Sequence, residues 1–464
     1  MKKLPHLFDD QTPPAPLAAQ QRGWLRGVLL VVLLVLVTRI VVWSGAYLGA
    51  AAVFCVRHQW EPPVAPHAGA LIRRLRDSGA LESQSPRELL KTSDEPEIRS
   101  ARELLFNFAP LVQFDGLNYR SIITGGYQYQ PPPADAAPYE WQQNIAFFPL
   151  YPLICRPLAS LLTVEAALVA VAQACTFAAA IVLYLWIRRR IDEHTAFFTV
   201  AVTFCLPAAC YYSFAYSESL TLLLVVTALW LMDRRRFGWA AVVCGLATAT
   251  RPTALGIVPV FMLALWFNAG GDIKRQCGRL VAMTPVAAAG ILGYGLYLTY
   301  RFGSPLVYLT NFKAGWVPDE ARANWVEYLT LVPLWAQLKH FGWAIVGFPV
   351  GLIELTNPLT WNLPFCLFIL FLSLAGLTRV PRGFRPLLLL GPFLFLHAYL
   401  ASGGASRGID PLARYLAVSV PALVVLAAWC VREWRPGARA ALLVLMMLVQ
   451  AAWAFRFGLR EWCG

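Results

Sequence analysis

The sequence predicts an all-α fold, a polytopic bundle of membrane helices. Of its 464 residues, 58% are hydrophobic and only 14% are charged, whereas soluble globular chains carry about 25% charged residues. The mean hydropathy is +0.55. Apolar runs of about 20 residues, long enough to cross a hydrocarbon core of roughly 30 Å, recur along the whole chain. Because these runs are continuous rather than alternating, they exclude a closed barrel.

We expect about 10–12 transmembrane or embedded helices. The predicted segments are 28–47, 147–162, 166–187, 196–212, 220–232, 239–267, 280–300, 361–377, 387–401, 412–431 and 440–457, with 341–352 ambiguous.

The basic residues indicate the orientation of the chain. Its net charge is +13, and arginines gather in short loops at 188–190, 234–236 and 379–385. Cytoplasmic loops of membrane proteins carry such an excess of arginine and lysine. This clustering argues against a nucleic-acid groove and is compatible with attraction to anionic membrane lipids. We assign residues 1–27 to a cytoplasmic tail, the first span to an uncleaved helix, and residues 28–464 to a single membrane domain.

The longest polar stretch, residues 56–144, is therefore expected on the extracytoplasmic side. It contains two amphipathic segments, 71–81 and 96–108, which predict short helices, and near its end stands Asp115. The apolar segment 147–162 follows, but it contains three prolines and Arg156. If it crossed the membrane, residues 188–190 would lie outside, against the charge rule. A short helix embedded in the outer leaflet avoids that conflict.

Four polar groups of residues interrupt the apolar plan. The segment 239–267 starts and ends beside cytoplasmic charge and is broken at Arg251-Pro252, so it predicts two short helices that meet within the membrane. The four groups are Asp115 with Asn118 and Tyr119; Tyr216-Ser217-Glu218-Ser219; Thr250-Arg251-Pro252-Thr253; and His397, Arg407, Asp410, Arg414 and Tyr415.

Each group also has a structural interpretation. Asp115 is compatible with a solvated turn, since Asp-Gly is a common turn pair. Glu218 is compatible with a helix cap, where carboxylates favour the positive end of the dipole. Arg414 could pair with Asp410 four residues earlier. Arg251 is harder to explain in this way, because a charge within the membrane indicates function by default.

Together, the four groups suggest glycosyl transfer from a lipid-linked donor. An outward-facing acid can act as general base on a hydroxyl. Arginines near the same face can hold a phosphate through two parallel hydrogen bonds. Buried arginines need partners, and a lipid phosphate would suit these arginines better than any nearby carboxylate in the sequence. The surrounding apolar spans suit a polyprenyl chain.

Several motifs resemble the PIG-V-type mannosyltransferases, a family of the GT-C class of multi-span glycosyltransferases. In family order they are Phe114-Asp115-Gly116-Leu117-Asn118-Tyr119, Ala146-Phe147-Phe148-Pro149-Leu150-Tyr151-Pro152-Leu153, Tyr216-Ser217-Glu218-Ser219-Leu220, Ala249-Thr250-Arg251-Pro252-Thr253, Arg301-Phe302-Gly303-Ser304-Pro305-Leu306 and Arg414-Tyr415. In eukaryotes this family adds the second mannose of the GPI anchor from dolichyl phosphate mannose.

The resemblance implies a GT-C-like membrane domain and an inverting displacement with Asp115 as catalytic base. Relatives usually have Arg-Trp before this acid, where this chain has Gln113-Phe114. We expect mannose or a related sugar to pass from a polyprenyl-phosphate donor to a hydroxyl of a lipid-linked or glycan acceptor. The expected substrate-binding residues are Asn118, Tyr119, Glu218, Arg251, His397, Arg407, Arg414 and Tyr415. The compact chain suggests a bacterial inner-membrane member, active on the extracytoplasmic face.

Nothing in the sequence calls for a cofactor. The 10 cysteines are scattered singly, and no metal-ligand spacing occurs, although a divalent metal is not excluded. The alternative to an enzyme is a transporter or flippase of lipid-linked saccharides. Many transporters show internal repeats with ion sites at the midplane, whereas this chain has no visible repeat and gathers its polar residues at one boundary. A non-catalytic scaffold would leave Asp115 and Arg251 without a role.

Overall fold

The computed structural model describes residues 17–57, 108–132, 142–268, 270–315, 324–346, 356–404, 408–409 and 411–461. The predicted amphipathic segment 71–81 lies outside the described residues, and so does 96–108 except for Phe108. Arg407 and Asp410 also lie outside them.

Helices account for almost all of the described secondary structure. In the first half they are α1 (Leu17–Arg57), η1 (Ala109–Leu111), α4 (Asp115–Gly125), η2 (Asn144–Ala146), α5 (Leu150–Ala159), α6 (Val164–Arg190), α7 (Glu193–Cys205), η3 (Pro207–Tyr212), α8 (Glu218–Asp233), α9 (Phe237–Thr248), η4 (Pro252–Gly256) and α10 (Ile257–Asn268).

The second half continues the pattern, with one two-residue hairpin. Its elements are α11 (Ile273–Ala287), α12 (Ala289–Phe302), α13 (Val307–Gly315), α14 (Trp325–Leu329), α15 (Val332–Val346), η6 (Pro358–Trp361), α17 (Asn362–Leu377), α18 (Arg385–Leu388), α19 (Leu390–Ser402), β1 (Gly403–Gly404), β2 (Gly408–Ile409), α20 (Leu412–Leu416), α21 (Val420–Glu433) and α22 (Pro436–Gly458). The two strands pair antiparallel.

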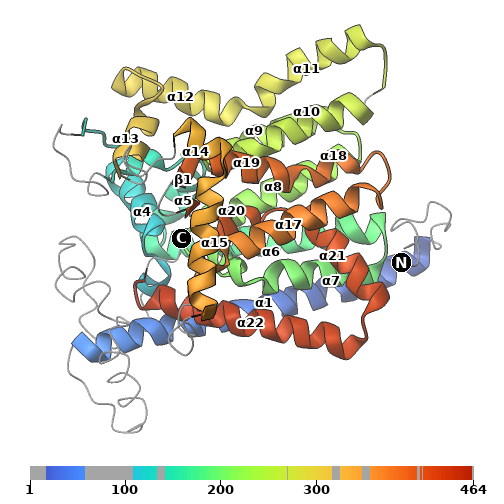
Figure 1. The fold of residues 1–464 in the computed structure, drawn as a ribbon, viewed down its shortest axis with the longest axis horizontal. Helices are drawn as coiled ribbons and strands as arrows, with labels where there is room; N and C mark the ends of the chain where they lie inside the picture. The colour runs from blue at the N-terminus through green and yellow to red at the C-terminus, as the bar shows by residue number, and fades with distance from the viewer. Residues whose placement is uncertain are drawn as a thin grey trace.

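The long helices run side by side and form a bundle (Figure 1). The terminal helices α1 and α22 pack along each other, α6 packs on α8, α8 on α9, and α7 on α21. In the view of Figure 1, α15 crosses the direction of the other helices, and α4 and α13 lie together at one end of the bundle. That end carries Asp115, the first residue of α4.

Four of the described helices are long and apolar enough to cross a membrane. They cover Trp24–Cys55, Val164–Arg190, Pro358–Leu377 and Pro436–Gly458, and a bent pair, α11 with α12, makes a fifth if it is one span. Helices are the natural spanning element, because each satisfies its own backbone hydrogen bonds where water is absent. The predicted fold class, an all-α membrane bundle, is confirmed, while the exact number of crossings stays a prediction.

Polar side chains mark where several helices begin. Thr163 accepts a hydrogen bond from the backbone N–H of Ala166 at the start of α6. Asp192 caps α7 by accepting from Thr195 N, and Asp272 caps α11 in the same way. Such caps satisfy N–H groups that have no partner within the helix. At the other end of α6, Arg188, Arg189 and Arg190 occupy the last turn, where cations favour the helix dipole.

Several predicted spans are broken. One break was expected, but 196–212 also divides into α7 and η3, and 412–431 divides into α20 and α21. The predicted break at Arg251-Pro252 is confirmed, since α9 ends at Thr248 and η4 begins at Pro252. The predicted continuous span 280–300 is instead the pair α11–α12, bent by 55°. Pro285 lies inside α11, where it removes a backbone donor and its ring clashes with the preceding turn. The predicted embedded segment 147–162 contains the short helix α5.

Candidate active site

Asp115 follows a residue with an unusual backbone conformation. Phe114 has φ 49° and ψ −110°, a region that residues with a side chain rarely adopt. The chain is held there from two sides: Ala215 N donates to Leu111 O at 3.0 Å, and the Phe114 ring contacts the Phe457 ring edge-on at 5.5 Å. Strained residues of this kind gather at functional sites. The carboxylate that begins α4 therefore has a fixed direction.

Glu218 begins α8 and is almost completely buried, with 1% of its side chain exposed. The N-cap of α8 is Ser217, and no side chain caps this helix by a hydrogen bond. The Glu218 carboxylate makes ion pairs instead. Oε1 accepts from Arg251 Nη1 at 2.5 Å and from the Nε of Arg414. Its second oxygen, Oε2, is buried without a hydrogen-bond partner. Glu218 is thus the shared counter-ion of two arginines from distant parts of the sequence.

Arg251 stands at the break between α9 and η4. Its backbone is extended, with φ −169°, as expected for a residue before proline. The guanidinium lies over the ring of Tyr415, 5.0 Å from its centroid, a favourable cation–π geometry. Arg251 therefore lies outside both helices, and its side chain reaches Glu218 and the α20 residue Tyr415.

Arg414, on α20, joins the two carboxylates. Its Nη2 donates to Asp115 Oδ2 and its Nε to Glu218 Oε1. Its guanidinium also faces two tyrosine rings, 5.2 Å from the centroid of Tyr211 and 4.6 Å from that of Tyr216. The predicted alternative, a pair with Asp410, falls outside the described residues. The structure places a carboxylate against each arginine: Glu218 pairs with both, and Asp115 pairs with Arg414. Whether a lipid phosphate suits the arginines better stays a prediction.

These four residues, Asp115, Glu218, Arg251 and Arg414, form what we call the four-charge cluster. The negative charges of its two carboxylates equal the positive charges of its two guanidinium groups. Exposure of the side chains rises from 1% for Glu218 and 5% for Arg414 to 13% for Arg251 and 20% for Asp115. Asp115 is therefore the member most accessible to a substrate. Removing one partner of a buried pair costs about 3–5 kcal/mol, because the other charge is left uncompensated.

Two other predicted residues lie beside Asp115 on α4. Tyr119 is buried, and its hydroxyl donates to Ser217 Oγ at 2.8 Å. Burial, and then the negative charges of Glu218 and Asp115, raise the pKa of the Tyr119 phenol well above its usual value. The phenol therefore stays neutral. Asn118 donates to the carbonyl of Phe114 at 3.4 Å and so ties the first turn of α4 to the strained residue.

Of the remaining predicted residues, two lie near Arg251 and one falls outside the described part of the chain. Tyr415 lies with Arg251, as described above. His397, on α19, is partly buried and within electrostatic reach of Arg251. Arg407 lies outside the described residues. The structure thus brings together seven of the eight predicted substrate-binding residues around Asp115 or one of its arginines: Asn118, Tyr119, Glu218, Arg251, His397, Arg414 and Tyr415.

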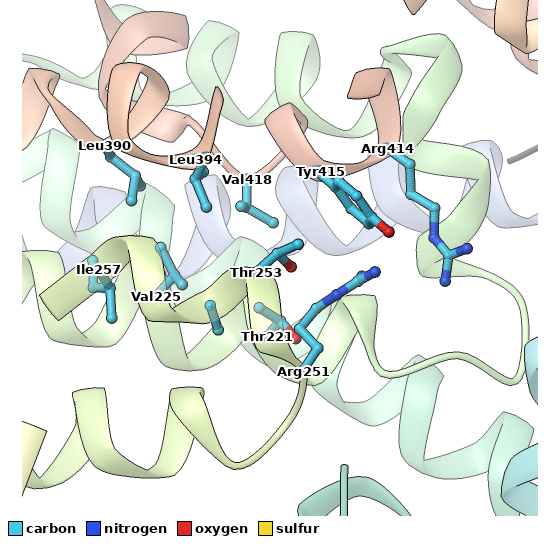
Figure 2. Close-up of a pocket in the computed structure, with 11 residues that line it drawn as sticks. Thr221, Val225, Arg251, Thr253, Ile257, Leu390, Leu394, Arg414, Tyr415 and Val418 are labelled. Carbon is cyan, nitrogen blue, oxygen red and sulfur yellow. The ribbon is translucent and has the colours of Figure 1, made fainter. Parts of the chain in front are cut away.

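A pocket adjoins the two arginines. It is lined by Thr221, Val225, Arg251, Thr253, Ala254, Ile257, Leu390, Leu394, Arg414, Tyr415 and Val418. Figure 2 shows the guanidinium groups of Arg251 and Arg414 at one end, with the Tyr415 ring beside them, and aliphatic side chains at the other. An anionic head attached to an apolar chain would match this distribution of charge.

Two contributors were not predicted. Tyr211 faces Arg414 with its ring, and the aromatic run 211–216 in the sequence could have indicated it. Arg39 is buried in the first span and bonded to the carbonyl of Ala209. A charge within an apolar run indicates function by default, so the same rule that selected Arg251 applies to Arg39. Among the described residues, no group of three or more His, Cys, Asp or Glu side chains could hold a metal ion.

The sequence model of the family described as Mannosyltransferase (PIG-V) matches residues 132–275. The predicted resemblance to this family is confirmed over that range, which includes Glu218 and Arg251. Asp115 and Arg414 lie outside that range, and the roles of all four residues stay predictions. Among curated proteins, none matches this chain.

The comparison with solved structures gives matches of low similarity. An oligosaccharyltransferase of Archaeoglobus fulgidus, in complex with Zn and sulfate, aligns at 16% identity and a TM-score of 0.40, over 73% of this chain and 48% of that one. ArnT from Cupriavidus metallidurans, bound to undecaprenyl phosphate, aligns at 14% identity and a TM-score of 0.42, over 75% and 71%. The chain spans about half the length of the archaeal enzyme.

Proposed function

We propose that this chain is a membrane glycosyltransferase that moves a sugar, mannose, from a polyprenyl-phosphate donor to a hydroxyl of a lipid-linked or cell-envelope acceptor. The observation that carries the proposal is the four-charge cluster, whose two arginines line a pocket together with apolar side chains. Two of its members, Glu218 and Arg251, lie within the segment that matches a mannosyltransferase family. The family match supports mannose as the sugar.

The pocket supports a phosphate with a lipid chain as the donor. Arg251 and Arg414 both line it, beside apolar side chains such as Leu390 and Leu394. A guanidinium offers parallel donors that match two phosphate oxygens. The aliphatic end would receive the first part of the polyprenyl chain, which gains free energy by leaving water.

The reaction we propose is a single displacement. The oxygen of the acceptor hydroxyl attacks the anomeric carbon and forms the new glycosidic bond. The bond from that carbon to the phosphate oxygen breaks, and polyprenyl phosphate leaves with the electron pair. Asp115 accepts the proton of the attacking hydroxyl, and the anomeric configuration inverts. A positioned general base contributes about 10²–10⁴-fold to such a step.

Arg414 gives this mechanism an order of binding. In the structure it pairs with Asp115 and Glu218. A donor phosphate in the pocket would compete with Asp115 for the Arg414 guanidinium. Once Arg414 turns to the phosphate, Asp115 loses its cation and can accept a proton. Donor binding would thus precede activation of the base, and Glu218 would keep both arginines in place before the donor arrives.

The location follows from the arginine distribution. The short loops at 188–190 and 234–236 are expected in the cytoplasm, and Asp115 lies within the long loop 56–144, which is expected on the extracytoplasmic side. We propose that the reaction occurs on the extracytoplasmic face of a bacterial inner membrane. The acceptor is then a lipid-linked or glycan hydroxyl of the cell envelope.

A transfer assay tests the proposal against the flippase alternative. The purified chain in detergent is given polyprenyl-phosphate [³H]mannose and a hydroxyl-bearing lipid acceptor. We expect labelled product from the wild type and none above background from Asp115→Asn. Absence of product from the wild type, together with movement of the labelled lipid across reconstituted vesicles, would replace the enzyme with a flippase.

A further inference from the structure

Arg39 is a buried cation near the middle of the first membrane span, Trp24–Cys55. Only 3% of it is exposed, and it shares the buried face of α1 with Val35, Val42 and Ala46. Within the described part of the chain, no carboxylate pairs with it. Its Nη1 and Nη2 donate to the carbonyl of Ala209 at 3.4 and 3.5 Å, and its Nε and Nη2 to Thr38 Oγ1 at 3.3 Å. An uncompensated charge at this depth is expensive.

Gln450, on α22, makes a parallel contact. It is fully buried, and its Nε2 donates to the carbonyls of Phe204 and Leu206 at 3.1 and 3.0 Å. Those carbonyls, and that of Ala209, belong to the end of α7 and the start of η3. The regular α-helical hydrogen-bond pattern is interrupted there, although the Leu206 carbonyl also accepts from Ala209 N at 2.9 Å. Carbonyls at a helix end carry partial negative charge. Arg39 on α1 and Gln450 on α22 therefore both donate hydrogen bonds to backbone carbonyls around the break between α7 and η3.

The terminal helices are held close enough to deliver both side chains. A Cβ added at Gly45 would lie 2.7 Å from the carbonyl oxygen of Ala451, and one added at Gly49 or Gly458 would collide with the backbone of the opposite helix. Glycines at such positions let membrane helices approach closely. Further along α22, the Phe457 ring stacks on Phe214 at 3.7 Å. The α1–α22 pair thus supports the segment 207–216 at several levels.

The supported segment carries the rings that face Arg414. Tyr211 follows two residues after Ala209, stacks on Tyr216 with their centroids 6.2 Å apart, and both rings lie against the Arg414 guanidinium. A shift of η3 would therefore move the aromatic surroundings of Arg414. Effects of this kind can be large, because a misplacement of about 1 Å far from the chemistry can cost about 100-fold in rate.

We propose that Arg39 and Gln450 are positioning residues, which hold the break between α7 and η3 so that Tyr211 and Tyr216 fix Arg414 for the donor. The inference rests on the proposed function, because it takes Arg414 as a ligand of the donor phosphate. It assigns a role in catalysis to the terminal helices, neither of which contributes a side chain to the four-charge cluster.

Three variants test the positioning role. Arg39→Gln removes the charge. Gln450→Leu removes the side-chain N–H groups while keeping a side chain of similar size. Arg39→Lys keeps the charge but loses the planar arrangement of N–H groups. Asn268→Ala is the control, since Asn268 also donates to a backbone carbonyl, that of Gly383 at 3.0 Å. Asn268 is the last residue of α10, at the end of that helical segment that is far from Arg251, so its loss should not disturb the four-charge cluster.

We expect kcat/KM for the donor to fall by roughly 10- to 100-fold in Arg39→Gln and Gln450→Leu. The KM of the acceptor should keep its wild-type value, and Arg39→Lys should recover part of the loss. A purely structural role would instead reduce the amount of folded protein and leave both constants unchanged. Backbone hydrogen exchange of residues 207–219 should become faster in the two damaging variants and not in Asn268→Ala.

Each result decides the inference. Wild-type donor kcat/KM in folded Arg39→Gln and Gln450→Leu would overturn it. If Arg39→Gln does not fold, Gln450→Leu and Arg39→Lys carry the same comparison. If the wild type transfers no sugar, the proposed function fails separately. In that case unchanged hydrogen exchange of 207–219 would also overturn the inference, and faster exchange would support the part of it that concerns η3.

Discussion

Asp115 and Arg414 are 299 residues apart in the chain and form an ion pair at one end of the helical bundle. The pair joins the start of α4 to α20, and Arg414 extends it to Glu218 and so to Arg251. This arrangement makes the charges of the cluster depend on one another. A substrate that attracts Arg414 changes the surroundings of both carboxylates at once.

Lysine at either arginine position should impair transfer. Lysine keeps the charge but cannot present two parallel donors to a phosphate, and at position 414 it cannot reach Asp115 and Glu218 with separate nitrogens of a planar group. We expect kcat/KM for the donor to fall by at least about tenfold in Arg251→Lys and in Arg414→Lys. Arg234→Lys, in an exposed loop, is the control. Unchanged kinetics in both cluster variants would refute a phosphate site here.

Glu218→Gln should destabilise the protein in a way that a phosphate can repair. The change leaves Arg251 without its anion and Arg414 with only Asp115, at an expected cost of about 3–5 kcal/mol. A bound anion restores the missing charge. Undecaprenyl phosphate should therefore raise the melting temperature of the variant in detergent more than that of the wild type, and undecaprenol should not. Equal increases for both proteins would remove Glu218 from the anion site.

Tyr119 should affect stability only in alkaline solution. Its pKa is raised in the folded state above an unfolded value of about 10. Its stabilising contribution is therefore complete below about pH 10 and is lost as the pH rises through the folded-state value. Tyr119→Phe should cost about 1 kcal/mol near neutral pH, for the lost bond to Ser217, and should lose less stability than the wild type above about pH 10. Parallel alkaline curves for the two proteins would contradict this.

The sequence predicted the spans well because hydropathy is a local property. The predicted segment 166–187 lies within α6 (Val164–Arg190), and 361–377 nearly coincides with η6 and α17. The break at Arg251-Pro252 was also predictable, since a proline acts on its own turn. The bend between α11 and α12 was not predicted, although Pro285 was present, because proline inside a membrane helix is often tolerated.

Pairings between distant residues could not be read in the same way. The sequence identified the acids and arginines of the cluster one by one, but not that Arg414 joins Asp115 to Glu218, since that depends on how α4, α8 and α20 pack. The same holds for Arg39, whose partner is the backbone carbonyl of Ala209 in η3. The positive φ of Phe114 also escaped prediction, because its ring packs against Phe457, a residue far along the chain.

Cysteine labelling should give the orientation of the bundle. We expect Thr124→Cys, exposed on α4, to react with a membrane-impermeant thiol reagent in intact cells, and Arg234→Cys to react only after permeabilisation. The wild type supplies the background, since its Cys277 is exposed. Labelling of Arg234→Cys in intact cells, with Thr124→Cys protected, would place the four-charge cluster on the cytoplasmic side and refute the proposed location.

Asp115→Asn provides the sharpest test of the mechanism. Asparagine matches the size and polarity of aspartate but cannot take the proton of the acceptor hydroxyl. Loss of a positioned base should lower kcat by about 10²–10⁴-fold, while the protein still folds, because Arg414 keeps Glu218 as its anion. The donor should bind at least as tightly as in the wild type, since Asp115 no longer competes for Arg414. Glu433→Gln, at an exposed position, should leave kcat unchanged. If Asp115→Asn retained more than a few per cent of wild-type activity by the radiolabel assay, another acid would have to accept the proton, and Glu218, with its free Oε2, would be the candidate.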